Sequence, residues 1–280
     1  MRIITDSAAD FTREELEKSN IHCVPTQVMF GEDCYSAGQD LSNETFWSRL
    51  MAGEDVKTSQ PSPETFLHEF EAAKEAQEEA VCICISSALS GTLQSARIAA
   101  SMIDYDRIHI IDSLTGAAGQ KLLVLAACKL RDEGRLLAHE LVAKVEALRS
   151  RVRLFASLDT LENLARSGRI PKAVANLGTL AQLKPLLEVT PEGKIALCGK
   201  AFGRHRAIDA LAKRIASMNI DRSHPFIPLY SYDTKNCLDL ISKLESLGHQ
   251  VDAKMMSAIG PAIAGHIGPN AYGAAFFISE

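Results

Sequence analysis

Short apolar stretches alternate with longer amphipathic stretches along the first half of this chain. The apolar stretches are too short for helices and rich in β-branched residues, so each is predicted to be a buried strand. The predicted strands are Arg2–Thr5, Cys23–Phe30, Val81–Ile85 and Arg107–Ile111. Helices are expected to begin near Thr12, Ser42, Ser62 and Ser90, and to cover Thr115–Asp132 and Leu136–Arg149. This alternation is typical of a mainly parallel sheet covered by helices.

The second half adds a pattern that a purely parallel sheet lacks. Apolar runs at Pro185–Thr190 and Lys194–Cys198 flank Pro191-Glu192-Gly193, which predicts a β-hairpin. The other expected elements are strands at Arg153–Ser157, Pro225–Tyr230, Gln250–Met256 and Ala274–Ser279, and helices over Asp159–Ser167, Arg204–Ser217 and Lys235–Leu247. A mixed sheet is therefore expected in this half.

The chain has 280 residues, enough for two α/β domains. We place the boundary between an N-terminal domain of residues 1–155 and a C-terminal domain of residues 156–280. A ligand is expected in a slot between the two halves, because binding sites often lie between domains.

The segment Val81–Thr92 is the most informative part of the sequence. A buried strand ends in hydroxyl residues, and a helical pattern begins at Leu93. Ser90 is the predicted N-cap of that helix, and the amides of Gly91 and Thr92 are expected to face the same space as the hydroxyls. Such a corner favours an anion, because helix N-termini are electropositive. The alternative is a well-capped helix without a ligand.

A second group of hydroxyls precedes another predicted helix. Ser62 can cap this helix and Pro63 suits its first position, but that account leaves Thr58 and Ser59 without a role. Because Pro61 keeps the preceding residue extended, residues 58–60 are predicted to form a stiff, solvent-facing segment.

The third unusual segment runs from Gly260 to Pro269. Two Gly-Pro steps bracket what we expect to be an apolar turn, and this turn carries His266. Its glycines suit close approach of the backbone to a ligand or to another chain segment. The alternative for His266 is a loop histidine whose hydrogen bonds are satisfied within the protein.

Charge and cysteine content restrict the function classes. The net charge is −5, with −10 in residues 1–150 (14 Lys and Arg against 24 Asp and Glu) and +5 in residues 151–280 (16 against 11). The sequence pI of about 5.9 does not favour nucleic-acid binding. The seven cysteines are scattered, and we expect packed thiols in a reducing cytoplasm. We expect no signal peptide and no integral membrane contact, because Met1–Asp6 already has a strand pattern and no apolar run is long enough to span a bilayer.

The basic residues of the middle of the chain form a candidate docking surface for an acidic partner or a phosphate. The residues are Arg149, Arg151, Arg153, Arg166, Arg169 and Lys172. The alternative is an ordinary solvated face.

Familiar catalytic signatures are absent from the sequence. There is no G-x-S-x-G, G-x-G-x-x-G, Walker lysine loop or H-E-x-x-H, and no cluster has metal-ligand spacing. A serine-dependent acyl hydrolase using Ser90 and His266 is the alternative function. Its histidine needs an orienting acid, for which Asp112 and Asp159 are the candidates.

Five motifs of the chain resemble the DegV family. They are Thr5-Asp6-Ser7-Ala8-Ala9-Asp10, Thr58-Ser59-Gln60-Pro61-Ser62, Ser86-Ser87-Ala88-Leu89-Ser90-Gly91-Thr92, Leu158-Asp159-Thr160-Leu161 with Ser167-Gly168-Arg169-Ile170, and Gly260-Pro261 through His266-Ile267-Gly268-Pro269. They occur in family order and cover essentially the whole chain.

The resemblance implies a cytoplasmic two-domain α/β protein that holds one long-chain fatty acid between its domains, without a cofactor or a metal. Some members are the lipid-binding subunit of a fatty acid kinase and present the carboxylate to a separate ATP-using subunit. Carried over by motif, the carboxylate residues are Thr58, Ser90, Gly91, Thr92 and His266. Arg169 is implied in phosphotransfer and Arg204 in partner contact, and transient visits to a membrane surface are expected.

Three residues depart from the family pattern. Phe202 stands where an arginine is expected, Gly265 replaces a frequent threonine, and Asn270 replaces a glycine. These departures are expected to alter the head-group region, the acyl preference or the use of a kinase. A carrier or sensor of another small apolar acid, without an enzyme partner, is the remaining hypothesis.

Overall fold

The computed structural model describes residues 1–175 and 182–280, and these form two compact units. Unit 1 contains Met1–Ser150 and Gly260–Ala262, and unit 2 contains Arg151–Ile259 and Ile263–Glu280. The chain first leaves unit 1 five residues before the boundary expected after residue 155. Strand β8 (Val152–Ser157) therefore stays whole within unit 2.

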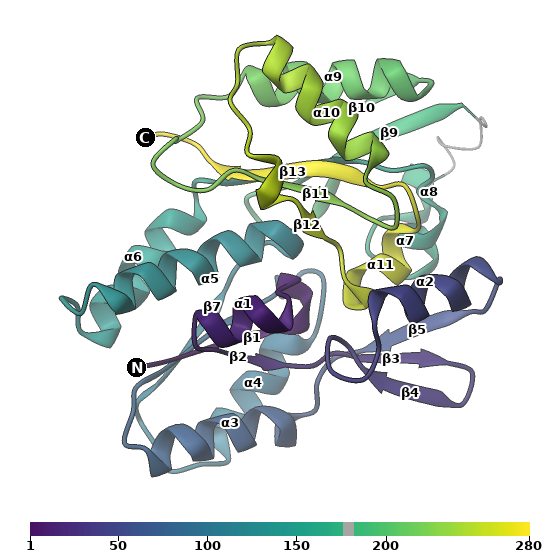
Figure 1. The fold of residues 1–280 in the computed structure, drawn as a ribbon. Coiled ribbons are helices and arrows are strands. Elements are labelled where there is room, and N and C mark those ends of the chain that lie inside the picture. The colour runs from purple at the N-terminus through teal and green to yellow at the C-terminus, as the bar shows by residue number, and fades with distance from the viewer. Residues whose placement is uncertain (176–181) are drawn as a thin grey trace. The chain divides into compact units, whose positions relative to one another are not determined.

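A four-stranded parallel sheet forms the centre of unit 1; its strands β1, β2 and β7 are labelled in Figure 1. The strand order is β2-β1-β6-β7. Its strands are β1 (Arg2–Asp6), β2 (Ile21–Val24), β6 (Ala80–Cys84) and β7 (Ile108–Asp112). Every residue of β6 is buried, as expected for a parallel strand covered on both faces. Cys82 and Cys84 point to the same side of β6, with 3.6 Å between their sulfur atoms. The predicted parallel α/β architecture is confirmed for this unit.

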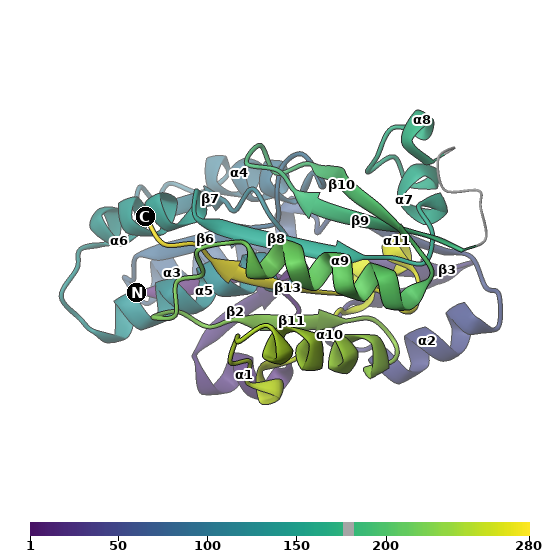
Figure 2. The same ribbon diagram turned by 90° about the horizontal axis from the view of Figure 1, so that it is seen from above.

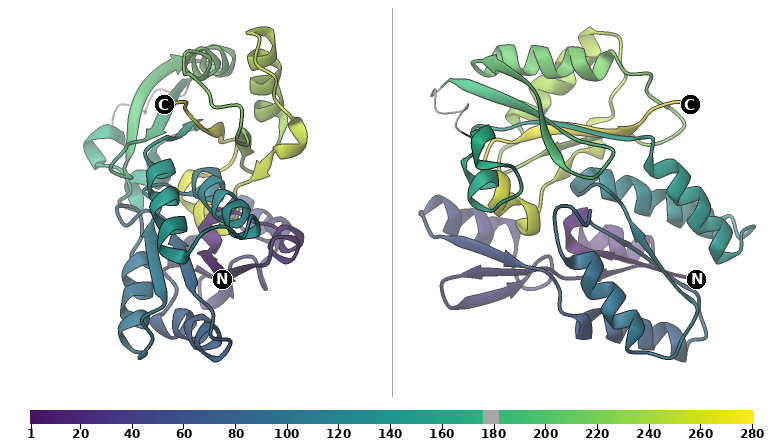
Figure 3. Two further views of the ribbon diagram at one scale, coloured as in Figure 1. Left: turned by 90° about the vertical axis from the view of Figure 1, so that its left-hand side faces the viewer. Right: turned by 180° about the vertical axis from the view of Figure 1, so that it is seen from behind.

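The helices of unit 1 are α1 (Arg13–Lys18), α2 (Asn43–Met51), α3 (Pro63–Glu75), α4 (Thr92–Ser101), α5 (Ala117–Asp132) and α6 (Ala138–Arg149), with the 3₁₀ turn η1 (Ser7–Ala9). Helix α2 lies apart from the parallel sheet (Figure 1), with the ring of Phe46 5.8 Å from that of Phe30. Helices α3 and α4 lie side by side and bury Phe66, Phe70 and Leu93 with one face of the sheet (Figure 3). Helix α1 begins near Thr12 as predicted, with a capping box in which the Glu15 amide donates to Thr12 Oγ1 and the Thr12 amide donates to Glu15 Oε2.

Unit 1 also contains a small antiparallel sheet that the sequence analysis missed. Its strands are β3 (Gln27–Phe30), β4 (Asp33–Ser36) and β5 (Val56–Ser59), in the order β4-β3-β5. The single strand predicted at Cys23–Phe30 is wrong. The chain leaves the parallel sheet after Val24, passes through Pro25, which has no amide hydrogen for a ladder, and then enters the second sheet.

Unit 2 is built on a six-stranded mixed sheet, in the order β10-β9-β8-β13-β11-β12. Besides β8, its strands are β9 (Leu183–Val189), β10 (Ile195–Phe202), β11 (Ile227–Tyr230), β12 (Ser257–Ala258) and β13 (Tyr272–Phe277). The predicted hairpin is confirmed as β9–β10, and its turn is closed by a 2.8 Å hydrogen bond from the Thr190 amide to the Lys194 carbonyl. Only β11 and β12 pair in parallel among the strands of this sheet.

Two long amphipathic helices of unit 2, α9 (Arg204–Ala216) and α10 (Lys235–Ser246), cover one face of that sheet (Figure 2). Their buried residues form one core with strand residues such as Phe155 and Phe276. The shorter helices of this unit are α7 (Glu162–Arg166) and α8 (Lys172–Ala175), with the 3₁₀ turn η3 (Ala253–Met255). Helix α11 (Pro261–Ile267) begins in unit 1 and belongs to unit 2 from Ile263 onward.

Two predictions for the end of the chain are wrong. No strand forms at Gln250–Met256. Ala253–Met255 are η3 instead, where the Asp252 side chain accepts a hydrogen bond from the Lys254 amide and favours a turn over a ladder. The turn expected between Gly260 and Pro269 is helix α11. Pro261 stands at its first position, where a missing amide hydrogen costs nothing.

Candidate functional site

The hydroxyl corner of unit 1 consists of residues Ser90, Gly91 and Thr92, between β6 and α4. The hydroxyls of Ser90 and Thr92 are 2.9 Å apart, and the Thr92 amide donates to Ser90 Oγ at 3.3 Å. Thr92 is buried, and Ser90 and Gly91 are partly exposed. The prediction that Ser90 is the N-cap is wrong, because the cap is Gly91. The Ser90 hydroxyl nevertheless points back to the first turn of α4.

Gln60 joins the second hydroxyl segment to this corner. Thr58 lies in β5, paired with Val28 of β3, and Gln60 follows the end of the strand. Gln60 Nε2 donates to the buried Ser95 hydroxyl of α4 at 3.0 Å. An ideal Cβ at Gly91 would lie 1.9 Å from Gln60 Oε1, so only glycine leaves room for this side chain. The two hydroxyl segments are thus held next to each other.

Gln60 is a residue of this site that was not predicted from the sequence. Its position in the sequence was the one signal of a role in the site. Gln60 stands between Thr58-Ser59, whose hydroxyls had no role in the predicted helix cap, and Pro61. Ser62 and Pro63 occupy the N-cap and first position of α3, as predicted. The predicted solvent-facing segment is in part strand β5, in which Thr58 is half-buried and Ser59 is exposed.

Asp112 organises the loop that precedes the hydroxyl corner. Its carboxylate accepts hydrogen bonds from the Ser87 hydroxyl at 2.5 Å, from the Ser87 amide at 3.2 Å and from the Leu114 amide at 3.0 Å. These bonds tie the end of β7 to the loop after β6. Asp112 therefore has a structural role in its loop.

Two buried carboxyl groups lie at the end of β1. Asp6 accepts from the amides of Ala8 and Ile85 and from Gln120, and burial raises its pKa. Burial also raises the pKa of Asp10 to about 7, although the Gly260 amide donates to Asp10 Oδ1 at 2.9 Å and Lys121 lies nearby. Both residues belong to the Thr5–Asp10 motif, for which the sequence suggested no chemistry.

His266 lies in the last turn of α11, in unit 2. Burial is the main cause that lowers its pKa to about 4, and the positive charge of Arg169 lowers it further. Burial also lowers the pKa of Arg169, whose Nη1 donates to the Ser167 carbonyl at 2.5 Å. The imidazole is therefore neutral at pH 7 and can accept or donate one hydrogen bond at each ring nitrogen according to its tautomer.

Arg204 belongs to a different part of unit 2. Its Nη1 donates to Asn236 Oδ1 at 3.0 Å, and its Nη2 is 2.9 Å from Asp239 Oδ2. Both partners lie in the first turns of α10, so the arginine joins the starts of α9 and α10. Phe202, two residues earlier, is half exposed.

The structure thus groups the predicted site residues in three places. Ser90, Gly91 and Thr92 form the hydroxyl corner, and Gln60 holds the Thr58 segment against it. His266 is grouped with Arg169 in unit 2, and Arg204 lies in the network of α9 and α10. That a ligand joins the groups of the two units stays a prediction.

The hydroxyls of Ser90 and Thr92 and the imidazole of His266 are neutral hydrogen-bonding groups of the kind that can bind a carboxylate. The serine hydrolase alternative is not favoured, because Asp112 bonds to Ser87 and Leu114, and Asp159 bonds to Lys184 and Asn270. Within residues 1–175 and 182–280, no group of three or more His, Cys, Asp or Glu side chains could hold a metal.

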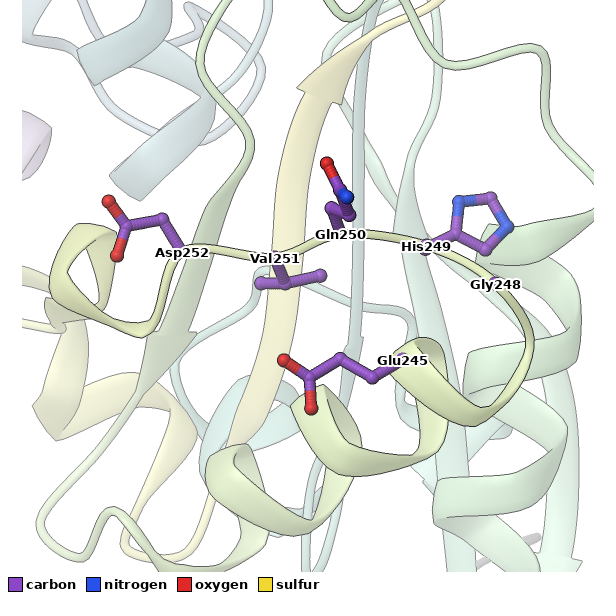
Figure 4. A pocket seen from close by; sticks show the side chains of 6 residues that line it. All are labelled: Glu245, Gly248, His249, Gln250, Val251 and Asp252. Carbon is purple, nitrogen blue, oxygen red and sulfur yellow. The ribbon is translucent and has the colours of Figure 1, made fainter.

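A surface pocket of unit 2 lies where the chain leaves α10 (Figure 4). It is lined by Glu245, Gly248, His249, Gln250, Val251 and Asp252. None of the predicted site residues lines it. In the described part of the chain, no helix is both long and apolar enough to cross a membrane.

Comparison with known proteins gives the same family along the whole chain. The profile described as "Uncharacterised protein, DegV family" matches residues 1–279. A DegV domain-containing protein of Lactococcus lactis is 33% identical over 273 residues, covering 95% of this chain and 94% of the relative.

Two solved structures of the same fold are of proteins described as fatty-acid binding. A fatty-acid-binding DegV family protein of Thermus thermophilus is 30% identical, with a TM-score of 0.86 over 99% of this chain and 100% of the other. A stearic-acid-binding protein of Eubacterium ventriosum is 27% identical, with a TM-score of 0.88 over 99% of this chain and 98% of the other. The predicted two-domain α/β fold class is confirmed.

Proposed function

Because this chain belongs to the DegV family, we propose that it binds one long-chain fatty acid and is a carrier without catalytic activity of its own. The observation that carries this proposal is the hydroxyl pair of Ser90 and Thr92. One of the two hydroxyl protons is used between them, and the other is available to a carboxylate oxygen. Thr58, Gly91 and the neutral imidazole of His266 complete the proposed head-group site.

Binding energy in this proposal comes mainly from the acyl chain. Burial contributes about 0.8 kcal/mol per methylene, so a long chain supplies on the order of 10 kcal/mol before association costs. The head-group site needs only to orient the carboxylate. Neutral donors suit a carrier, because a carboxylate paired with a buried cation is less available for transfer.

The finer part of the proposal is presentation of the carboxylate to an ATP-dependent kinase subunit that forms an acyl phosphate. Arg169 is proposed to stabilise the charge of the transferring phosphoryl group, for which the planar guanidinium is well suited. Arg204 is proposed to contact the partner. The free cysteines of the described chain suit a reducing cytoplasm, where we place the protein.

Two variants test this proposal in one experiment that measures fatty-acid affinity and acyl-phosphate formation. Ser90→Ala should weaken fatty-acid binding by about 1–3 kcal/mol, because it removes a hydrogen bond to a charged group. Arg169→Ala should leave the affinity nearly unchanged and lower acyl-phosphate formation with ATP and the partner kinase about tenfold, or about 1.4 kcal/mol.

Ser101→Ala is the matched control, because this serine is exposed at the end of α4 and donates only to the nearby Ile98 carbonyl. Unchanged affinity in Ser90→Ala would contradict the carboxylate site. Equal loss of binding and transfer in Arg169→Ala would place this arginine in the head-group site. A covalent acyl adduct on Ser90 would support the hydrolase instead.

A further inference from the structure

The loop Gly268–Ala271, which we call the α11–β13 loop, is held on its inner side by a buried serine. Ser231 is fully buried, and its hydroxyl donates to the Gly268 carbonyl at 2.8 Å. The Ala271 amide donates to the same hydroxyl at 2.9 Å. One side chain therefore fixes both ends of the loop.

Asn270 holds the outer side of this loop. Its backbone has φ = 62°, a left-handed conformation that asparagine adopts more readily than most residues other than glycine. Its Nδ2 donates to Asp159 Oδ2 at 2.8 Å, and Lys184 Nζ donates to Asp159 Oδ1 at 2.6 Å. Asparagine thus keeps the backbone conformation of the glycine expected at this position and adds a bond that glycine lacks.

The network extends from Asn270 to Arg204 through one amide side chain. Asn236 Nδ2 donates to the Asn270 carbonyl at 3.3 Å, and Asn236 Oδ1 accepts from Arg204 Nη1 at 3.0 Å. The side chain and the carbonyl of Asn270 are therefore both engaged. The loop is fixed to the segment after β8 and to the start of α10.

This loop follows directly on the turn of α11 that carries His266. The Gly268 amide donates to the Ala264 carbonyl at 2.9 Å, and the φ of 75° at Gly268 ends the helix. Only Ile267 separates His266 from Gly268. Ile267, Gly268 and Pro269 separate His266 from Asn270, and all three are restrained, by the helix, by the Gly268 hydrogen bond and by the proline ring. A shift of the loop is therefore transmitted to His266 over a short, stiff segment.

We propose that Asn270 is a positioning residue for the carboxylate site: by binding Asp159 it fixes the α11–β13 loop and so holds His266 in its half-buried place. The effect of Asn270 on ligand binding rests on the proposed fatty-acid function. Its effect on His266 itself is independent of any ligand.

Asn270→Gly tests this directly, because glycine tolerates the positive φ and the substitution removes only the side-chain bond and backbone stiffness. Asn20→Gly is the matched control, since Asn20 also has a positive φ, of 46°, and is exposed in unit 1. The readout is the titration of His266 by NMR in the ligand-free protein, with the resonance assigned by comparison with His266→Gln.

The wild-type imidazole is expected to titrate near pH 4, because burial and the charge of Arg169 lower its pKa. Asn270→Gly should move this titration toward the ordinary value of 6.5 by half a pKa unit or more, as the imidazole gains solvent. Asn20→Gly should leave it in place. The same pKa in Asn270→Gly and wild type overturns the proposal.

Fatty-acid dissociation, measured by stopped-flow fluorescence with a labelled acyl chain, is the second readout. Asn270→Gly should release the ligand roughly tenfold faster than wild type and Asn20→Gly, the scale of one lost hydrogen bond to a charged group. An unchanged rate overturns the role in the carboxylate site. Wild type that binds no fatty acid contradicts the proposed function, while the His266 titration still decides the positioning role.

Asp159→Ala provides a second variant if Asn270→Gly does not fold. It removes the carboxylate that accepts from Asn270 and Lys184. Loss of a negative charge by itself lowers a histidine pKa, so a rise of the His266 pKa in this variant reports the solvent that the imidazole gains. An unmoved or lowered titration in this folded variant also overturns the proposal.

Discussion

Gly91 is important to the candidate site because it has no side chain and so leaves room for Gln60. The sequence indicated Ser90, Gly91 and Thr92 by their place between a strand and a helix. It did not indicate Gln60, because the contact of Gln60 with Gly91 and Ser95 joins residues more than thirty positions apart. The cap was misplaced by one residue, since serine and glycine are both acceptable N-caps.

We predict that Gly91→Ala weakens fatty-acid binding about tenfold, because the new Cβ would meet Gln60 Oε1 and force that side chain away from Ser95. The measurement is the dissociation constant by isothermal titration. Gln60→Ala removes the atom in conflict, so the double variant should bind no more weakly than Gln60→Ala alone. Additive losses in the double variant would contradict this account of the corner.

At the scale of elements, the sequence predicted those with strong periodicity and missed those set by contacts. Strands β1, β6 and β7 and helices α5, α9 and α10 agree with their patterns to within two or three residues. Strands β4 and β5 have four residues each, none of them fully buried, and carry little apolar signal. Helix α11 was predicted as a turn because its glycines and prolines are helix breakers in isolation.

The start of α11 is anchored by Asp10, whose carboxyl accepts from the Gly260 amide. Burial raises the Asp10 pKa from 3.8 to about 7, and Asp6 adds to this while Lys121 opposes it. Between about pH 4 and pH 7, the Asp10 carboxyl keeps a proton in the folded state that it has lost in the unfolded chain. The free-energy contribution of this group to stability is thus present below about pH 4 and lost as the pH rises through 7.

We predict that Asp10→Asn flattens this dependence, because a neutral amide keeps an acceptor for Gly260 without titrating. The unfolding free energy of wild type includes a contribution from Asp10 that is lost from pH 4 to pH 7, and the variant has no such loss. The difference in unfolding free energy, variant minus wild type, should therefore rise by at least about 1.4 kcal/mol over this range, the equivalent of one pKa unit. Urea unfolding across this range measures the difference. Asp104→Asn, at an exposed aspartate, is the control. Parallel pH curves for Asp10→Asn and wild type would contradict the raised pKa.

At the scale of the whole molecule, the sequence predicted two α/β halves and their family. It could not predict the use of individual basic residues. Arg149 donates to the Asp112 carbonyl within unit 1, and Arg151 pairs with Asp221 within unit 2, so both of these arginines stabilise the fold. Arg166 and Lys172 are exposed. Such pairings arise between distant segments and leave no local pattern.

The most direct test of the central claim is to extract the purified protein with organic solvent and identify the released lipid by mass spectrometry. We predict about one long-chain fatty acid per chain, because a buried acyl chain dissociates slowly from such a site. Adding oleate or palmitate to the delipidated protein should raise its melting temperature, with about 2.7 kcal/mol of stabilisation at a hundredfold excess over the dissociation constant. An extract without stoichiometric lipid, together with an unchanged melting temperature, would contradict the account.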